Sequence, residues 1–201
     1  MSSYRRLLRT DAEQLREHLL RLDGDTRQAR FSAITSDSTI KRYVAGIDWE
    51  WAPLIGWFDE GVLRAVAEIR FSRGILPTEA ELAFSVEKRY QGGRIGSNLM
   101  SRALIVLRNR GVRTAHIVCL LTNRRMQKLA LRHRADVRAQ SGEVFMTIAV
   151  PQGDIGSLIS EITDEYIGWI NAGVDMALHM PMMGVFAVMG QRDRGPPHAR
   201  H

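Results

Sequence analysis

Cysteine and lysine are both scarce in this chain. Cys119 is the single cysteine, which excludes an internal disulfide framework and any metal site built from several cysteines. It lies in the apolar run 117–121, a setting typical of a small buried side chain and not of a nucleophile. Nearly all of the positive charge is carried by arginine, because the lysines are limited to Lys41, Lys88 and Lys128.

Long apolar runs are absent as well. The longest nearly uncharged stretch, 176–190, is shorter than the roughly 18–20 residues that a bilayer-spanning helix needs. Residues 1–6 lack the apolar core of a signal peptide. These absences favour a cytoplasmic protein without a membrane partner.

The composition is that of a globular protein with a basic charge. Of the 201 residues, 45% are hydrophobic and 25% are charged, and the formal net charge is +6. Such a charge suits a polyanion or an anionic cofactor. Because the arginines are scattered along the chain, we expect a basic soluble surface and not a dedicated nucleic-acid face.

Apolar periodicity predicts an α/β fold, with a mixed central sheet flanked by helices in residues 1–150. A capping box at 10–13 opens the first helix, and a hairpin turn at 59–61 joins two strands. We expect helices at 10–22, 38–46, 95–110 and 123–134, and strands at 49–58, 62–71, 80–86, 114–120 and 144–150.

Residues 151–201 are predicted to form a C-terminal helical extension that ends in a disordered tail. An apolar helical stripe covers 155–170, and a methionine-rich stretch covers 176–189. Two interpretations stay open for the stripe. It packs on its own domain, or it forms the surface of a homodimer or another partner, to which methionine side chains adapt well.

The stretch 80–100 is the most informative part of the sequence. It begins as a half-buried strand whose apolar face carries Leu82, Phe84 and Val86. A glycine loop follows at 91–96, and from Ile95 the apolar period becomes helical up to a stop at Gly111. Such a loop directs free backbone N–H groups and the positive end of a helix dipole at one point. This arrangement suits a phosphate group.

In these residues the chain resembles the GNAT superfamily of acyl-CoA-dependent N-acyltransferases, over roughly residues 50–150. The family's signature places Gln/Arg-x-x-Gly-x-Gly/Ala after an apolar strand, at the start of a helix. Here Val86 ends the strand, while Gln91 and Gly96 take the first and last places. A second family element, with matching residues at intervals of three, is found at Asn123, Met126 and Leu129.

The chain departs from the signature at its fourth position. This position is normally glycine, and here it is Arg94. Its guanidinium would either add a charge-assisted contact to a pyrophosphate or distort and close the loop.

The resemblance implies acetyl-CoA as a co-substrate. The backbone of 84–86 would bind the pantetheine arm, and the N–H groups of 91–97 would hold the pyrophosphate. Asn123 would anchor the arm or simply cap its helix. The family often supplies a tyrosine that reprotonates the leaving thiolate. None occurs at 123–150, where His133 is the nearest titratable substitute. The implied cofactor-binding residues are Phe84, Ser85, Val86, Gln91, Gly92, Gly93, Arg94, Ile95, Gly96, Ser97 and Asn123.

Acetyl transfer to an amine also needs a general base within reach of the nitrogen, directly or through water. Several protein-acetylating members of the family use a glutamate on the central strand. Glu81 stands at the matching place and is the first candidate for the catalytic base. Glu68, on the preceding strand, is the second candidate, although it could instead pair with Arg70 or Arg64.

The predicted function is transfer of an acetyl group from acetyl-CoA to a primary amine, either a protein lysine or a small molecule, by direct attack with a glutamate base. The motifs are most similar to those of bacterial protein-lysine acetyltransferases. One alternative is a non-catalytic acyl-CoA-binding module with a regulatory or scaffold role. Another is a KH-like RNA-binding module, suggested by the GxxG spacing of 93–96. A KH loop joins two helices, whereas a strand precedes this one.

Overall fold

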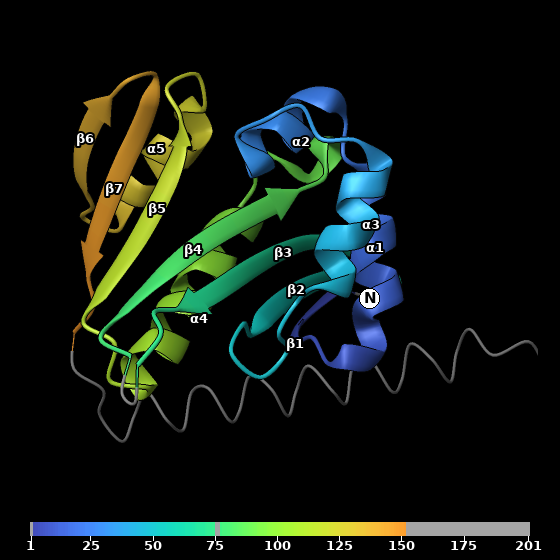
Figure 1. Ribbon diagram of the computed structural model, residues 1–201, viewed down its shortest axis with the longest axis horizontal. Helices are drawn as coiled ribbons and strands as arrows, with labels where there is room; N and C mark the ends of the chain where they lie inside the picture. The colour runs from blue at the N-terminus through green and yellow to red at the C-terminus, as the bar shows by residue number, and fades with distance from the viewer. Residues whose placement is uncertain (1, 75–76, 152–201) are drawn as a thin grey trace, which may run out of the picture.

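The protein is built on a mixed seven-stranded sheet (Figure 1). The computed structural model describes residues 2–74 and 77–151, so the predicted C-terminal extension lies outside the described residues. The strands are arranged in the order β1-β2-β3-β4-β5-β7-β6, and only β4 and β5 pair in parallel. They are β1 (Ser2–Arg6), β2 (Leu54–Asp59), β3 (Val62–Phe71), β4 (Glu79–Val86), β5 (Thr114–Leu120), β6 (Asp136–Gln140) and β7 (Glu143–Ala149).

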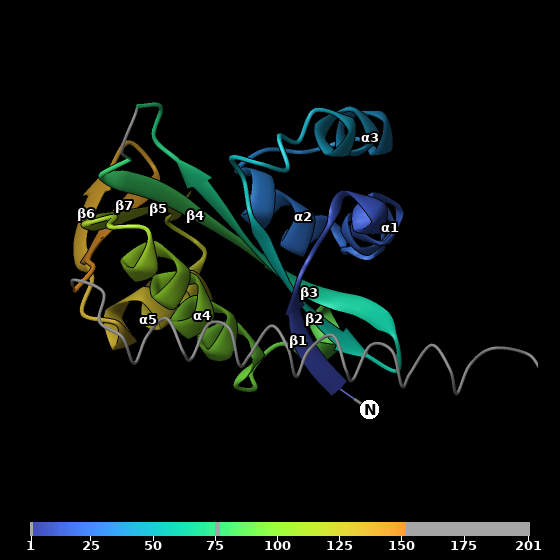
Figure 2. The ribbon, with the colours of Figure 1, turned by 90° about the horizontal axis from the view of Figure 1, so that it is seen from below.

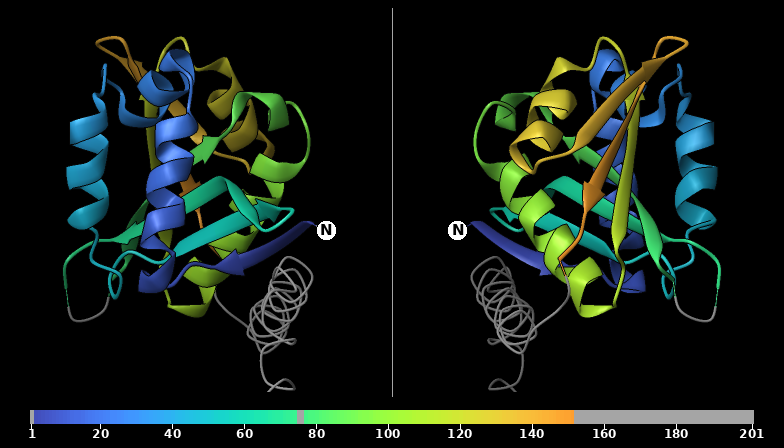
Figure 3. Two further views of the ribbon diagram at one scale, coloured as in Figure 1. Left: turned by 90° about the vertical axis from the view of Figure 1, so that its right-hand side faces the viewer. Right: turned by 90° about the vertical axis from the view of Figure 1, so that its left-hand side faces the viewer.

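Helices cover both faces of this sheet, as Figure 2 shows. One face carries α1 (Ala12–Arg21), α2 (Gly24–Phe31) and α3 (Asp37–Ala45), with α1 and α3 side by side (Figure 3). The opposite face carries α4 (Ile95–Asn109) and α5 (Arg124–Arg132). No helix in residues 2–74 and 77–151 is long and apolar enough to cross a membrane.

The alternation of β4 assigns its side chains to the two faces. Leu82 and Phe84 are buried in the core that α4 and α5 share with the sheet. Ser85 points to the opposite face, where it contacts α1. The other core lies between the sheet and α1 and α3, and it contains Leu15, Leu19, Ile40 and Val44. The two-residue period of the strand therefore separates an apolar face from a more polar one.

Most of the predicted elements are confirmed. The strands at 62–71, 80–86 and 114–120, the long helix from Ile95 and the turn at 59–61 lie where the periodicity placed them. Glu60 and Gly61 have positive φ angles of 51° and 73° in that turn. Gly111, with φ 73°, follows the end of α4 as a left-handed C-terminal residue.

Several short elements were not predicted, each for a physical reason. β1 and β6 are short edge strands without an alternating apolar pattern. The residues that β1 buries are the polar Ser3 and Arg5, and every residue of β6 is exposed. α2 buries no residue and has no apolar stripe. It begins with Gly24, a residue typical of a helix end, and the Asp23 side chain caps α2 by accepting the Thr26 N–H at 2.8 Å.

Two predicted boundaries are wrong. Residues 49–53 form a turn and a bend and not a strand, and β2 begins only at Leu54. The capping box at 10–13 does not form, because Asp11 accepts the Leu8 N–H at 2.8 Å and its carboxylate binds the Arg5 guanidinium. The segment before α1 is thus tied to β1 by Asp11, an internal residue of the predicted capping box.

β4 and β5 separate soon after their parallel pairing begins. They pair from Glu79 with Thr114 to Glu81 with His116, and no further. On its other side β4 stays paired with β3 as far as Val86. The edge of β4 that faces β5 therefore has no partner strand beyond Glu81, which opens the sheet at the carboxyl ends of these two strands.

We expect the buried Arg5–Asp11 ion pair to contribute measurably to stability. The two side chains are 6% and 9% exposed, and two nitrogen–oxygen distances between them are 2.8 Å. Asp11→Asn removes the charge that compensates a buried guanidinium, so the free energy of unfolding should fall by about 3 kcal/mol. Urea denaturation measures this loss. Glu13→Gln, which removes the exposed pair with Arg16, is the control and should cost less than about 1 kcal/mol. Equal losses in the two variants would contradict the prediction.

Candidate functional site

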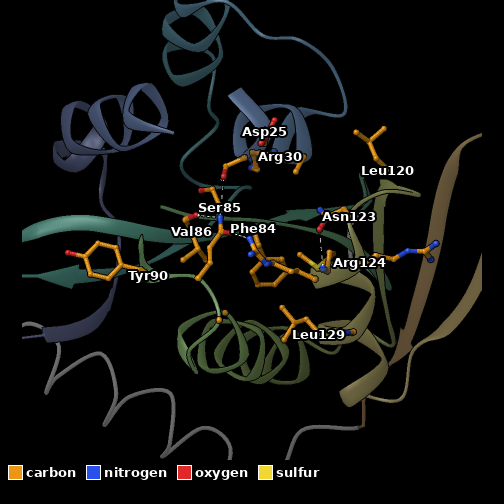
Figure 4. Close-up of a pocket in the computed structure, with 18 of the residues that line it drawn as sticks. Asp25, Arg30, Phe84, Ser85, Val86, Tyr90, Leu120, Asn123, Arg124 and Leu129 are labelled. Carbon is orange, nitrogen blue, oxygen red and sulfur yellow. Dashed lines mark hydrogen bonds between the residues drawn. The ribbon is translucent and has the colours of Figure 1, made fainter. Parts of the chain in front are cut away.

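A cavity of about 750 Å³ occupies the space where β4 and β5 separate. Its walls come from the end of β4, the glycine loop and first turn of α4, the start of α5, and α2. Figure 4 shows Phe84, Ser85 and Val86 on one side of it and Asn123 on the other. All of the predicted cofactor-binding residues line this cavity except Arg94 and Ile95.

The glycine loop presents unpaired backbone donors to the cavity. Gly92 has a φ of 87°, a conformation that favours glycine, and a Cβ on Gly92 or Gly93 would meet no atom within 4 Å. The first hydrogen bond of α4 runs from the Asn98 N–H to the Arg94 carbonyl, and no side chain caps this helix. The N–H groups of 95–97 therefore remain for an anion, aided by the helix dipole.

The backbone conformation at position 94 of this loop does not require glycine. Arg94 has φ −86° and ψ −3°, a right-handed conformation open to any residue. Its side chain is exposed and is not part of the cavity wall. The substitution at the fourth position of the signature is therefore compatible with the backbone of the loop.

Gln91 links three walls of the cavity. Its side-chain nitrogen donates to the Val86 carbonyl at 2.8 Å and to the Thr26 hydroxyl at 3.2 Å. Its side-chain oxygen accepts a hydrogen bond from Arg125. The side chain thus connects the end of β4 with α2 and α5, and it holds the loop against the strand that precedes it.

The electrostatic character of the cavity is cationic. Within residues 2–74 and 77–151, Asp25 is the one carboxylate in its wall, while the cationic side chains there are Arg30, Arg124, Arg125, Lys128 and Arg132. Four of these come from the first turns and exposed face of α5. An extended ligand that carries phosphate groups is complementary to such a wall.

Asn123 begins α5 as its N-cap. Its side-chain oxygen accepts the Met126 N–H at 3.1 Å, which satisfies one of the free donors of the helix. The side chain also lines the cavity, where its amide nitrogen is left to donate to a ligand. The two roles proposed for Asn123 from the sequence are compatible in this geometry.

Glu81 lies at the point where β4 and β5 separate. It is the last residue of β4 that pairs with β5, opposite His116, and it lies across from Arg70 on β3. The side chain is exposed and is not part of the cavity wall. Its parity places it on the same face of the sheet as Ser85, toward α2 and α3.

Glu68 is deeply buried and fully engaged. Its carboxylate accepts hydrogen bonds from Arg30 at 2.5 Å, from Arg70 at 2.7 Å and from the Tyr43 hydroxyl. Burial, together with the adjacent carboxylate, raises the pKa of Tyr43 to about 12. Of the two pairings considered from the sequence, the one with Arg70 forms, whereas Arg64 binds Glu87. Glu68 thus joins α2 and α3 to β3.

A third buried group connects α1 to the cavity wall. His18 is 0% exposed, with its Nε2 atom 2.8 Å from the Ser85 hydroxyl and its Nδ1 atom 3.3 Å from Glu87. Glu87 also accepts from Arg21 at 2.9 Å and from Arg64 at 3.1 Å. Sequence reasoning missed His18, although it occupies a buried position in the apolar stripe of α1, between Leu15 and Leu22, where a polar side chain is unusual.

His133, considered from the sequence as a substitute for the missing tyrosine, is not among the residues that line the cavity. It caps the C-terminal end of α5 and does not line the cavity. Partial burial lowers its pKa. The structure therefore does not bring His133 to the cavity wall.

Comparison with known proteins matches this chain to a protein family and to a relative of known name. The model of the acetyltransferase (GNAT) family matches residues 16–134. Acetyltransferase Pat of Mycolicibacterium smegmatis is 31% identical over 166 residues, which cover 80% of this chain and 49% of Pat. This chain thus spans about half the length of that relative.

Solved structures agree on the fold. The GNAT domain of S. lividans PAT has a TM-score of 0.64 and 22% identity, and the match covers 73% of this chain and 89% of that domain. The yncA protein of Salmonella typhimurium, solved with its cofactor acetyl-CoA, has a TM-score of 0.59 and 15% identity. That match covers 77% of this chain and 96% of yncA.

We expect Glu87 to make stability depend on pH. Burial by itself would raise the pKa of Glu87, but hydrogen bonds from His18 and Arg21 outweigh it and lower the pKa from 4.5 to about 2. A carboxyl with a depressed folded-state pKa stabilises the fold above its unfolded pKa, and this contribution disappears as pH falls from about 4.5 to about 2. Glu87→Gln should therefore be less stable than the wild type at pH 7, and the difference should shrink across that window. Denaturation at several pH values measures it, and a constant difference would contradict the assignment.

Proposed function

Because this chain belongs to the acetyltransferase (GNAT) family, we propose that it transfers an acetyl group from acetyl-CoA to a primary amine. Acetyl-CoA supplies the acetyl group as a thioester, and the amine nitrogen displaces the CoA sulfur. The acceptor that we propose is a lysine of a protein; a small-molecule amine is the alternative acceptor. The reaction is a direct attack, assisted by a carboxylate base.

The unpaired edge of β4 beyond Glu81 carries this proposal. An extended pantetheine arm suits that edge, because it can lie along the backbone of 84–86 as an added strand does. The free N–H groups at the start of α4 suit the pyrophosphate, and the cationic side chains of α5 suit the phosphates beyond it. The residues that hold acetyl-CoA in this proposal therefore lie on one continuous wall.

Glu81 is the general base that we propose. It stands where β4 and β5 separate, it is exposed to an incoming amine, and no hydrogen bond to its carboxylate is found in residues 2–74 and 77–151. Glu68 is less suited to this role, because its carboxylate already accepts hydrogen bonds from Arg30, Arg70 and Tyr43. A base at Glu81 acts on the nitrogen directly or through a water molecule.

The open side of the site favours a protein acceptor over a small one. The helices α1–α3 lie over the half of the sheet that contains β1–β4 (Figure 1). On the β5–β7 half, Val118 and Phe145 are neighbours across the two strands and are 37% and 41% exposed. A surface of this kind next to Glu81 can accommodate the residues that flank a lysine.

Calorimetry with acetyl-CoA tests the cofactor site. Gly96 lines the cavity, and a Cβ there would lie 3.6 Å from Leu129, so Gly96→Trp places an indole ring between α4 and α5. Micromolar binding by the wild type should be lost in this variant. Ser101→Trp, at an exposed position on the same helix, is the matched control and should bind normally. Binding by Gly96→Trp with unchanged affinity, or no binding by the wild type, would refute the cofactor site.

Steady-state kinetics with a panel of lysine peptides and small amines tests the base. Glu81→Gln should lower kcat by about 10²–10⁴-fold, because the nitrogen loses its proton acceptor, while acetyl-CoA affinity stays unchanged. Glu68→Gln should instead lower the melting temperature, because it weakens a buried carboxylate network. Binding of acetyl-CoA without transfer to any amine would favour the non-catalytic acyl-CoA-binding module.

A further inference from the structure

One buried chain of polar side chains is not used by the acetyl-CoA site proposed above, which involves only the backbone of Ser85. It runs from Ser85, in the cavity wall, through His18 of α1 to Glu87, just beyond the end of β4. Ser85 is 4% exposed, His18 is 0% exposed and Glu87 is 7% exposed, so Ser85 is the member that meets the cavity. A hydroxyl, an imidazole and a carboxylate in this order form a path along which a proton can move.

Burial and the neighbouring charges determine the protonation states of Glu87 and His18. Glu87 stays ionised, because it accepts hydrogen bonds from Arg21, Arg64 and His18. Burial lowers the pKa of His18 despite Glu87, and the cations Arg21 and Arg30 act in the same direction, so the ring is neutral at pH 7. A neutral ring next to an ionised carboxylate carries its proton on Nδ1. Its Nε2 atom therefore accepts the proton of the Ser85 hydroxyl.

We propose that Ser85, His18 and Glu87 form a proton shuttle that carries a proton from the acceptor nitrogen to the CoA sulfur. This inference rests on the proposed acetyl transfer. An amine that arrives as an ammonium ion loses two protons before it becomes an amide. Glu81 takes the first proton, and the shuttle takes the second.

The shuttle returns to its starting state in each cycle. As the nitrogen–carbon bond forms, the nitrogen gives a proton to the Ser85 oxygen, and the Ser85 proton moves to Nε2 of His18. Glu87 stabilises the imidazolium ion that results. When the carbon–sulfur bond breaks, the proton returns through Ser85 to the thiolate, which leaves as the free thiol. Glu81 releases the first proton to water, and no other reactant is consumed.

The shuttle supplies a proton that neither Tyr90 nor His133 is placed to supply. Tyr90 lines the cavity, but its hydroxyl already donates to Asp59 at 2.9 Å. No tyrosine occurs at 123–150, and His133 is outside the cavity wall. Ser85, in contrast, lines the cavity, and its hydroxyl is hydrogen-bonded to a neutral base.

Nitrogen NMR of the full chain tests the shuttle without any turnover. The His18 ring, assigned by its loss in His18→Gln, should be neutral at pH 7, with the proton on Nδ1. Ser85→Ala should shift the Nε2 resonance, while Nδ1 keeps its proton and its hydrogen bond to Glu87. A protonated ring, or a proton on Nε2, at pH 7 would overturn the shuttle whether or not the protein transfers acetyl groups.

Kinetics supply the second test. Ser85→Ala should lower kcat by about 10²-fold with unchanged acetyl-CoA affinity, and Ser85→Thr, which restores a hydroxyl, should recover most of the loss. In mixtures of light and heavy water, the wild-type rate should follow a curved dependence on deuterium content, because several protons move together. The dependence should become linear in Ser85→Ala. Ser3→Ala, at a buried serine of β1 that is 5% exposed, is the matched control.

The pH profile separates the shuttle from a structural role of His18. The wild-type kcat should fall as pH decreases through the pKa of His18, below its usual value of 6.5, because a protonated ring cannot accept the Ser85 proton. This fall of kcat at low pH should be absent in Ser85→Ala.

The remaining outcomes distinguish failure of the shuttle from failure of the proposed function. Transfer by the wild type with an unchanged kcat in Ser85→Ala, or a loss in Tyr90→Phe instead, overturns the shuttle alone. An acetyl group found on Ser85 by mass spectrometry shows a covalent route and also overturns it. No transfer by the wild type overturns the proposed function and the shuttle together.

Discussion

The separation of β4 from β5 is the constraint on which the rest of the site depends. Two parallel strands joined through a crossover helix keep their carboxyl ends at the same edge of the sheet. Here the pairing stops at Glu81, so the remaining edge of β4 faces a cavity instead of a strand. The glycine loop follows β4 and Asn123 follows β5, which brings both helix N-termini to the same opening.

The two faces of the sheet are stabilised by different kinds of contact. The face toward α4 and α5 is an apolar core, and it holds α4 firmly enough to fix the direction of its free N–H groups. The face toward α1–α3 contains buried carboxylates that are each paired with arginine: Asp11, Glu68 and Glu87. Because a buried carboxylate is costly unless it is paired, each of these groups specifies one position for the helix or segment that supplies its partner. The wall opposite the glycine loop is positioned in this way.

Much of the fold could be predicted because its central elements have regular apolar periods. The strand at 80–86 and the helix from Ile95 are buried on one side, so their periods of two and 3.6 residues are visible in the sequence. α2 and β6 lack that signal because none of their residues is buried. For the site, the loop at 91–97 and Asn123 could be found from spacing, whereas Arg30, Thr26 and Lys128 reach the cavity from surfaces that no local pattern marks.

The sequence by itself determined the mixed α/β fold, the strand–glycine loop–helix unit and its suitability for a phosphate, because these depend on neighbours along the chain. Only the tertiary structure decided which charged side chains are exposed and which are buried in ion pairs and hydrogen bonds. Glu68 and Glu81 are similar as candidates in the sequence, yet one is buried among Arg30, Tyr43 and Arg70 and the other is exposed at the point where the strands separate. The pairing of His18 with Ser85, which lies 67 positions further along the chain, likewise follows from packing α1 against β4. Contacts between distant segments leave no periodic trace, because they arise only when the sheet brings those segments together.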